Sequence, residues 1–368
     1  MCSLRVSGCR DPRKSLCLTA IDVPACPGLP EQNREILIPL EKGLLPVSKN
    51  CTLTLFSAAI AMLFTRLPMT GGAETEKGRI SLWVDLYQGE PISYGSVLED
   101  LASVQVIYLG ESHSIERHHD IQAQILDDLC KSGSPVALAM EQIEAFNQPS
   151  LDRYSRGEID FDELVKAIKW DERWNNYAQY REIVETARRH KTPVLALNAR
   201  AETIRQVARS GGLDKLDAEL RRELPADVEL HDPLYEKLLN MQMMVHMSAS
   251  PEKLRPMLEA QMCRDEMMAS VLANYLKSEE GKGRKAVVLC GAGHASYGLG
   301  TVARVRRRMP ELKDRVVLLT QSGDLQLSQE EKAMAREVDI THEQLREIGR
   351  PIADYLQVRS LTESDDAK

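Results

Sequence analysis

The chain has 368 residues, of which 43% are hydrophobic and 28% are charged, and its formal net charge is −8. This composition is typical of globular proteins, and the length suits one large domain or two small ones. The negative balance argues against nucleic acid as a partner, because a duplex-binding protein needs a strongly basic face. We therefore expect no nucleic-acid partner.

Residues 1–50 differ in composition from the remainder of the chain. They contain four of the eight cysteines, irregularly spaced at positions 2, 9, 17 and 26 with prolines between them, and no periodic apolar pattern. No CxxC pair occurs anywhere in the chain, which argues against a zinc knuckle. We expect this segment to be disordered or to be an over-extended gene start.

A short apolar run, LTLFSAAIAMLF, follows at residues 53–64. It is too short to span a bilayer but has the length of a signal-peptide core, so we expect a signal peptide over residues 51–73. The mature protein would then be exported and would reside in the periplasm or cell envelope. Cys51 precedes the apolar core and no cysteine follows it, so a lipoprotein attachment site is absent; membrane association by another route stays open.

The pattern from residue 79 onward alternates short apolar strands with helices. The segment 79–95 alternates apolar and polar residues around Gln88-Gly89 and predicts a β-hairpin. Buried strands are predicted at 104–110, 135–140, 192–198, 285–291 and 315–321, with a last strand at 353–360, and helices at 96–102, 118–131, about 149–190, about 200–280 and 300–309.

Wholly apolar strands that alternate with helices indicate a mostly parallel sheet covered by helices on both faces. We therefore predict an α/β domain over residues 79–361 and a short tail at 362–368. The long region at about 200–280 would be a helical insertion between the third and fourth strands of the parallel series.

Polar and ionisable residues follow four of these strands directly. The first strand ends in Gly110-Glu111-Ser112-His113, the second in Glu141, the third in Asn198 and Arg200, and the fourth in Gly291-Ala292-Gly293-His294. The carboxyl ends of parallel strands meet at one edge of a sheet, where ligands bind in open α/β folds. We therefore expect these side chains to form a functional cleft.

Three further residues, Asp265, His118 and His119, could belong to this cleft. Asp265 lies in the helical insertion, and a buried acid needs a partner, for which Arg200 is one candidate. His118 and His119 open a helix, where adjacent side chains point about 100° apart, so we expect at most one of them to face the cleft readily. Of the two, we favour His119 for the cleft.

The motifs of this chain resemble those of a known family. The two Gly-x-x-His turns, GESH at 110–113 and GAGH at 291–294, are accompanied by Glu141, a WDERW…Y..YR run from Trp170 to Arg181, an LNAR turn, and RDEMMA at 264–269. Together they are similar to the ChaN-like haem-binding uptake proteins of the Tiki/erythromycin-esterase superfamily, over about residues 80–360.

The resemblance implies haem as the cofactor and a role in handling iron. Haem needs an axial ligand such as His, Tyr or Met. Candidate ligands are Tyr177, Tyr180, Tyr297, His118 and His246. The spacing does not choose among them, and two haem groups could stack across a homodimer.

Two other chemistries use the same cleft. His113, His294, Glu111 and Glu141 could ligate one divalent transition metal. Alternatively, His113 could act as a general base positioned by Glu111 in a metal-free esterase. The alternative function is thus a hydrolase, either protease-like with a metal or esterase-like without one, acting on a small molecule or peptide.

Overall fold

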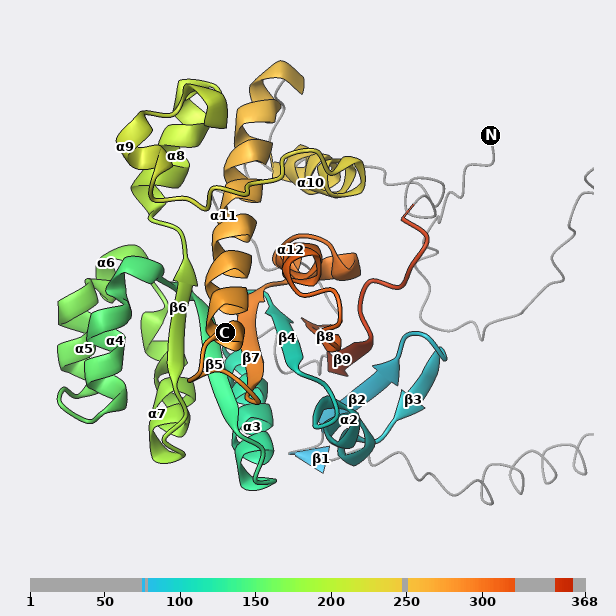
Figure 1. Ribbon diagram of the computed structural model, residues 1–368. Helices are drawn as coiled ribbons and strands as arrows, with labels where there is room; N and C mark the ends of the chain where they lie inside the picture. The colour runs from blue at the N-terminus through green and yellow to red at the C-terminus, as the bar shows by residue number, and fades with distance from the viewer. Residues whose placement is uncertain (1–74, 77–78, 247–250, 322–347, 360–368) are drawn as a thin grey trace, which may run out of the picture. The chain divides into compact units, whose positions relative to one another are not determined.

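The computed structural model describes residues 75–76, 79–246, 251–321 and 348–359 (Figure 1). The predictions for residues 1–50, 51–73 and 362–368 therefore lie outside the described residues. Within the described ranges, no helix is both long and apolar enough to cross a membrane.

One nine-stranded sheet organises the domain. Its order is β1-β2-β9-β8-β4-β7-β5-β6, and β3 pairs with β2. The strands are β1 (Thr75–Glu76), β2 (Arg79–Asp85), β3 (Glu90–Ile92), β4 (Val106–Glu111), β5 (Val136–Glu144), β6 (Val194–Asn198), β7 (Lys285–Gly291), β8 (Asp314–Gln321) and β9 (Tyr355–Arg359). The six strands from β9 to β6 in that order are parallel, whereas β1, β2 and β3 pair antiparallel. The predicted α/β fold with a mostly parallel sheet is confirmed.

Helices connect the parallel strands. The α-helices are α2 (Tyr94–Leu101), α3 (Glu116–Lys131), α4 (Gln148–Ser155), α5 (Phe161–Ile168), α6 (Trp170–Arg173), α7 (Arg181–Arg189), α8 (Ala201–Ser210), α9 (Ala218–Arg221), α10 (Pro233–His246), α11 (Pro251–Lys277) and α12 (Thr301–Arg308). The 3-10 helices are η1 (Ala145–Asn147), η2 (Tyr177–Tyr180), η3 (Leu213–Lys215), η4 (Ala292–His294) and η5 (Ser296–Gly298). The helices between β6 and β7 correspond to the predicted insertion.

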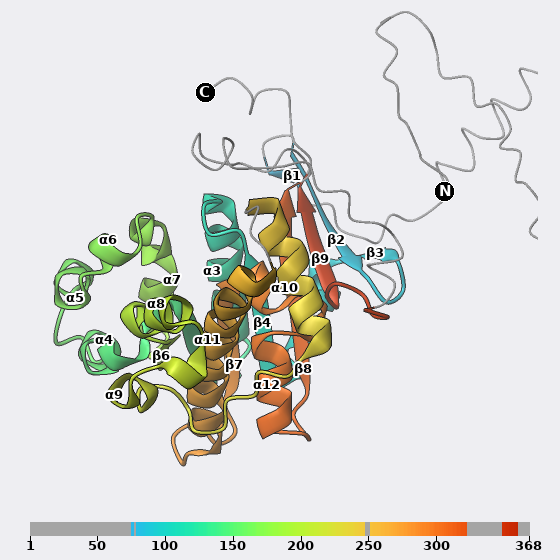
Figure 2. The same cartoon turned by 90° about the horizontal axis from the view of Figure 1, so that it is seen from above.

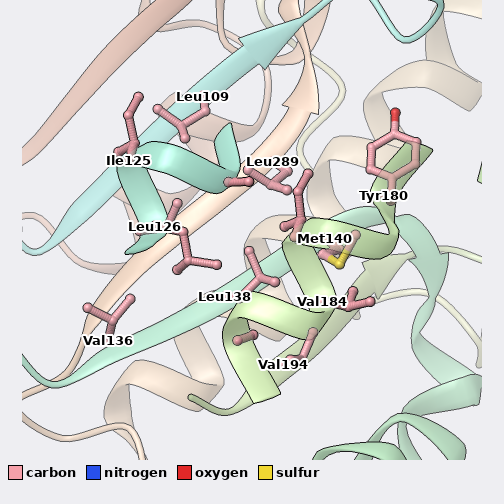
Figure 3. Packing of buried hydrophobic residues seen from close by; sticks show 14 of the residues in the cluster. Leu109, Ile125, Leu126, Val136, Leu138, Met140, Tyr180, Val184, Val194 and Leu289 are labelled. Carbon is pink, nitrogen blue, oxygen red and sulfur yellow. The ribbon is translucent and has the colours of Figure 1, made fainter. Parts of the chain in front are cut away.

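The alternation of side chains along each strand divides the core into two layers. On one face, Leu109, Leu138, Met140 and Leu289 are fully buried against α3, α4, α5 and α7. Figure 3 shows these strand residues meeting Ile125 and Leu126 of α3 and Val184 of α7. Because the strands are apolar on both faces, the sheet needs a second layer of helices.

The second layer is supplied by α11 and α12. Val106, Tyr108, Val288 and Cys290 point to this face, and Leu272 of α11 packs with them. Figure 1 shows α11 as the long orange helix that crosses the sheet. The predicted covering of both faces is therefore observed.

The amino-terminal half of α11 extends past this layer and carries the remaining inserted helices. Val207 of α8 packs with Cys263 of α11 in one small cluster. Tyr235 of α10 packs with Met262 of α11 in another, and Figure 2 shows α10 lying beside α11. The insertion thus has two small cores of its own, both built on α11.

Local backbone and capping interactions define the helices between β5 and β6. Asp160 caps α5 by accepting a hydrogen bond from Glu163 N, and the Glu163 side chain accepts one from Asp160 N. This reciprocal capping box fixes where the helix begins. Lys169 then ends α5 in a left-handed conformation (φ 52°), and the chain turns into α6 and η2, which carries Tyr180 back to the sheet.

Replacing a core side chain on β5 tests the packing directly. Leu138 is fully buried, so Leu138→Ala should lower the free energy of unfolding by about 2–5 kcal/mol, measured by urea denaturation. Tyr87→Ala is the control, since 68% of that side chain is exposed and its loss should change stability by less than about 0.5 kcal/mol. Equal effects of the two variants would contradict the assigned core.

Candidate functional site

The carboxyl ends of four parallel strands bring the predicted side chains to one edge of the sheet. Glu111 ends β4, Glu141 lies near the end of β5, Asn198 ends β6, and His294 follows β7 in η4. Glu111 is paired in register with Gly291 of β7, so the two Gly-x-x-His turns begin side by side. The predicted convergence is therefore observed.

Glu111 is the centre of the first half of the site. Its Oε1 accepts hydrogen bonds from Tyr180 Oη (2.5 Å) and Gln142 Nε2 (2.9 Å) and lies 2.7 Å from His113 Nδ1. Its Oε2 lies 3.3 Å from His119 Nε2. Burial alone would raise the pKa of this carboxyl, but the interactions with His113 and His119 prevail and lower its pKa to about 2. Glu111 is therefore an anion at neutral pH.

His113 is the accessible histidine of the site. Its side chain is 37% exposed, and its ring packs edge-on against Trp174 with 4.9 Å between centroids. Burial opposes protonation, but the hydrogen bond to Glu111 and the charge of Glu141 prevail and raise the pKa of His113. With Nδ1 held by Glu111, Nε2 lies against Gly291, where an added Cβ would come within 2.8 Å of it. Glycine at that position makes room for the ring.

His294 occupies a different environment, although its turn has the same sequence pattern. Its Nδ1 lies 2.7 Å from Asp265 Oδ1, and its Nε2 lies 3.1 Å from Glu141 Oε1. Asp265 also accepts hydrogen bonds from Tyr235 Oη (2.6 Å) and Thr301 Oγ1 (2.7 Å). Burial would lower the pKa of His294, but the two carboxylates prevail and raise its pKa to about 10. It is therefore a buried imidazolium at neutral pH, with both ring nitrogens engaged.

His118 and His119 are both buried, at 1% and 2% exposure, but only His119 lies against a carboxylate of the cleft, 3.3 Å from Glu111 Oε2. Ser112 N donates to His118 Nδ1 at 3.0 Å, and the ring of His119 lies 4.2 Å from that of Tyr180. Burial lowers the pKa of His118 to about 4, which keeps it neutral. The loop before α3 and η2 enclose the helix start from two sides, so side chains about 100° apart are both covered.

Asn198 belongs to the site, whereas Arg200 does not contact its carboxylates. Asn198 Nδ2 donates to the backbone oxygen of Glu141 at 2.9 Å. Arg200 instead lies 3.4 Å from Glu223 and over the ring of Phe146. The suggested Asp265–Arg200 pair is therefore wrong, because His294 takes that place.

The four side chains proposed as metal ligands are paired with one another and their neighbours. His113 is bound to Glu111, and His294 to Glu141 and Asp265. Among the described residues, no group of three or more histidine, cysteine or acidic side chains is arranged to hold a metal ion. The metal hypothesis thus receives no support from this geometry.

The candidate haem ligands differ in accessibility. Tyr180 is fully buried and donates its hydroxyl to Glu111, and Tyr177 packs against Phe161 and Trp170. The side chain of His246 lies outside the described part of the structure. Tyr297 is partly buried and has a left-handed backbone (φ 59°), and its hydroxyl forms no hydrogen bond with any described residue. A positive φ at a bulky residue is uncommon and marks a constrained position.

Several side chains of the site were not assigned their roles from the sequence. Gln142 and Tyr180 hold Glu111, and Tyr235 and Thr301 hold Asp265. The sequence could have identified Tyr180, because it lies in the WDERW…Y..YR motif. It could not have identified Tyr235 or Thr301, since their contacts depend on how α10 and α12 pack on α11.

The raised pKa of His294 predicts a specific dependence of stability on pH. The folded state holds one proton more than the unfolded state between pH 6.5, the unperturbed value, and about 10. The contribution of His294 is therefore complete below pH 6.5 and is lost as pH rises through this window, by up to about 1.4 kcal/mol per pH unit. Urea denaturation of the wild type and His294→Gln at several pH values measures it.

The control for that experiment is His231→Gln, because His231 is exposed in the loop before α10. The free-energy difference between wild type and His294→Gln should shrink from pH 6.5 to 9.5, whereas the difference for His231→Gln should stay constant. A constant difference for His294→Gln would contradict the buried imidazolium.

Comparisons with known proteins agree with the sequence motifs. A family profile described as haem-binding uptake, Tiki superfamily, ChaN matches residues 97–305, and no curated protein sequence matches the chain. The fold is similar to ChaN of Campylobacter jejuni, solved in a study of cofacial haem binding, with 20% identity, a TM-score of 0.58, and coverage of 77% of this chain and 98% of that chain. A mutant erythromycin esterase in its open conformation gives 11% identity, a TM-score of 0.39, and coverage of 65% and 77%. The profile match spans more than half of the chain and both Gly-x-x-His turns, so the chain belongs to the ChaN family of haem-binding uptake proteins in the Tiki superfamily.

Proposed function

We propose that the chain is an exported haem-binding protein that acts in iron uptake, with Tyr297 as the axial ligand. The observation that carries this proposal is the position of Tyr297, which has a constrained backbone after β7, is half-buried against an apolar cluster, and makes no hydroxyl hydrogen bond to a described residue. Membership in a haem-binding family supports the proposal, as does the similarity in fold to a protein studied for cofacial haem binding.

The surroundings of Tyr297 fit a haem group. An iron porphyrin needs an axial donor and apolar walls, and the iron supplies redox and ligand-binding chemistry when it is bound. Tyr297 packs against an apolar cluster that includes Leu238, Met241 and Leu299. Tyr180 is less suitable, because it is fully buried and donates its hydroxyl to Glu111. Tyr177 belongs to a separate aromatic cluster with Phe161 and Trp170.

Two further parts of this proposal rest on other features. Export rests on the signal-like segment at residues 51–73. A homodimer would allow two haem groups to face each other, as the comparison with Campylobacter jejuni ChaN suggests. In that arrangement Tyr297 of each copy would hold one haem group.

A haemin titration followed by Soret absorption tests the axial ligand. Tyr297→Phe removes the donor oxygen and keeps the ring, so haemin affinity should fall by at least about tenfold, equivalent to about 1.4 kcal/mol. Tyr177→Phe is the matched control and should change the affinity by less than about twofold. An unchanged titration of Tyr297→Phe, combined with loss of binding in His113→Ala, would transfer the ligand role to His113.

A second candidate function is hydrolysis of an ester or amide in a small molecule or peptide. The observation that favours it is the pair of His113 and Glu111, in which a buried anion orients an accessible imidazole. Such a histidine can accept a proton from water in its neutral form. His294 cannot share this role at neutral pH, because its protonated ring is held between two carboxylates.

The hydrolase reading predicts a pH profile. His113 must be neutral to act as a base, and its pKa is raised, so hydrolysis of p-nitrophenyl acetate should increase with pH through a midpoint above 6.5. Glu111→Gln removes the charge that raises this pKa, so the midpoint should move to lower pH. His113→Gln should abolish the activity, and a rate unaffected by it would exclude His113 as the base.

A further inference from the structure

A polar cavity of about 360 Å³ lies beyond the carboxyl ends of β5 and β6, next to Glu141. Its walls come from these two strands and from α6, α8 and α11. The volume is at the lower end of the range for small-molecule sites. Tyr297 does not line it, so this cavity is distinct from the proposed haem ligand.

Most charges on the cavity wall are neutralised within it. Arg173 lies 3.1 Å from Glu144 and 3.0 Å from Glu202, and Arg205 lies 3.0 Å from Glu202. Arg173 and Arg205 would gain little from binding a ligand, because each guanidinium is already paired with a carboxylate.

Arg264 of α11 is different. It is partly buried and lines the cavity, yet it forms no hydrogen bond or ion pair with any residue that the structure describes. The positive charge of Arg264 favours the ionised form of Glu141, but the oxygens of that carboxylate already have other partners. Oε1 of Glu141 faces His294, and Oε2 accepts a hydrogen bond from Gly291 N at 2.7 Å. The guanidinium therefore keeps donors available to the cavity.

Two acceptors in the cavity wall are also without partners. Asn198 and Gln142 are 5% and 4% exposed, and neither Asn198 Oδ1 nor Gln142 Oε1 has a hydrogen-bond partner among the residues that the structure describes. Their orientations are fixed, because Asn198 Nδ2 donates to the backbone of Glu141 and Gln142 Nε2 donates to Glu111. A buried acceptor without a partner costs about 1–3 kcal/mol, so a ligand that donates a hydrogen bond would gain from both atoms.

We infer that this cavity binds a small carboxylic acid that also carries an amino or hydroxyl group, with its carboxylate on Arg264. A guanidinium matches the planar geometry of a carboxylate, with two parallel hydrogen bonds. The amino or hydroxyl group would donate to Asn198 and Gln142. The nearby carboxylates of Glu141 and Glu144 disfavour a doubly charged phosphate, because like charges repel at short range.

Calorimetric titration of the full chain at constant ionic strength tests this site. L-Alanine carries the amino group and L-lactate the hydroxyl group, and acetate and inorganic phosphate are the comparison anions. At least one of the two acids should bind saturably and more tightly than acetate and phosphate; which acid binds better identifies the second group. Arg264→Gln should weaken that binding at least about tenfold, as expected for loss of a charged hydrogen-bonding partner.

Two further variants keep the test decisive. Arg209→Gln removes the same charge from an exposed position outside the cavity and should leave the affinity unchanged within about twofold. Arg264→Lys keeps the charge but not the planar fork, so it should bind more weakly than wild type and more tightly than Arg264→Gln. Absence of saturable binding by both acids, equal affinity in Arg264→Gln, or tighter binding of phosphate would overturn the inference.

Discussion

The buried carboxylate of Asp265 is the constraint on which the site depends. It lies on the inserted helix α11 and is fully buried, so its charge needs compensation inside the protein. That compensation comes from His294, Tyr235 and Thr301, which all contact the carboxylate. His294 also contacts Glu141 on β5, so it links α11 to the sheet. One carboxylate thereby fixes α10, α11, η4 and the start of α12 against the end of the sheet.

This constraint explains why two similar turns have different chemistry. Both Gly-x-x-His turns follow neighbouring strands, and both histidines contact a buried glutamate. His294 also contacts Asp265, which locks it as a cation, whereas His113 has Glu111 on one side and partial exposure on the other. Of these two histidines, His113 is the one with an exposed ring, and the pair divides into one accessible and one structural histidine.

The same network also explains why Arg264 has no carboxylate partner in the adjoining cavity. Glu141 is already paired with His294 and accepts a hydrogen bond from Gly291 N, so it does not form an ion pair with Arg264. The haem proposal and the small-acid proposal thus concern different parts of one edge. Tyr297 lies on the side of α10, and Arg264 lies on the side of β5 and β6.

The sequence predicted the parallel sheet and the meeting of Glu111, Glu141, Asn198 and His294, because apolar strands in this order place their ends at one edge. It did not predict the partners of these residues. Tyr180 is 69 residues from Glu111 along the chain, and its contact depends on the turn between α5 and α7. Arg200 likewise followed a strand but turned away toward Glu223. Apolar periodicity specifies which face of a helix is buried. It does not specify how far along the sheet the helix lies or how it is rotated, and these two variables decide which side chains come into contact.

The most direct test of this account is a pH titration of the imidazole resonances of His113, His118 and His294 by NMR. The account predicts that His294 stays protonated until about pH 10, that His118 stays neutral down to about pH 4, and that His113 titrates above 6.5. Assignments would come from single His→Gln variants. Titration of His294 in step with His113 would contradict the division into a structural and an accessible histidine.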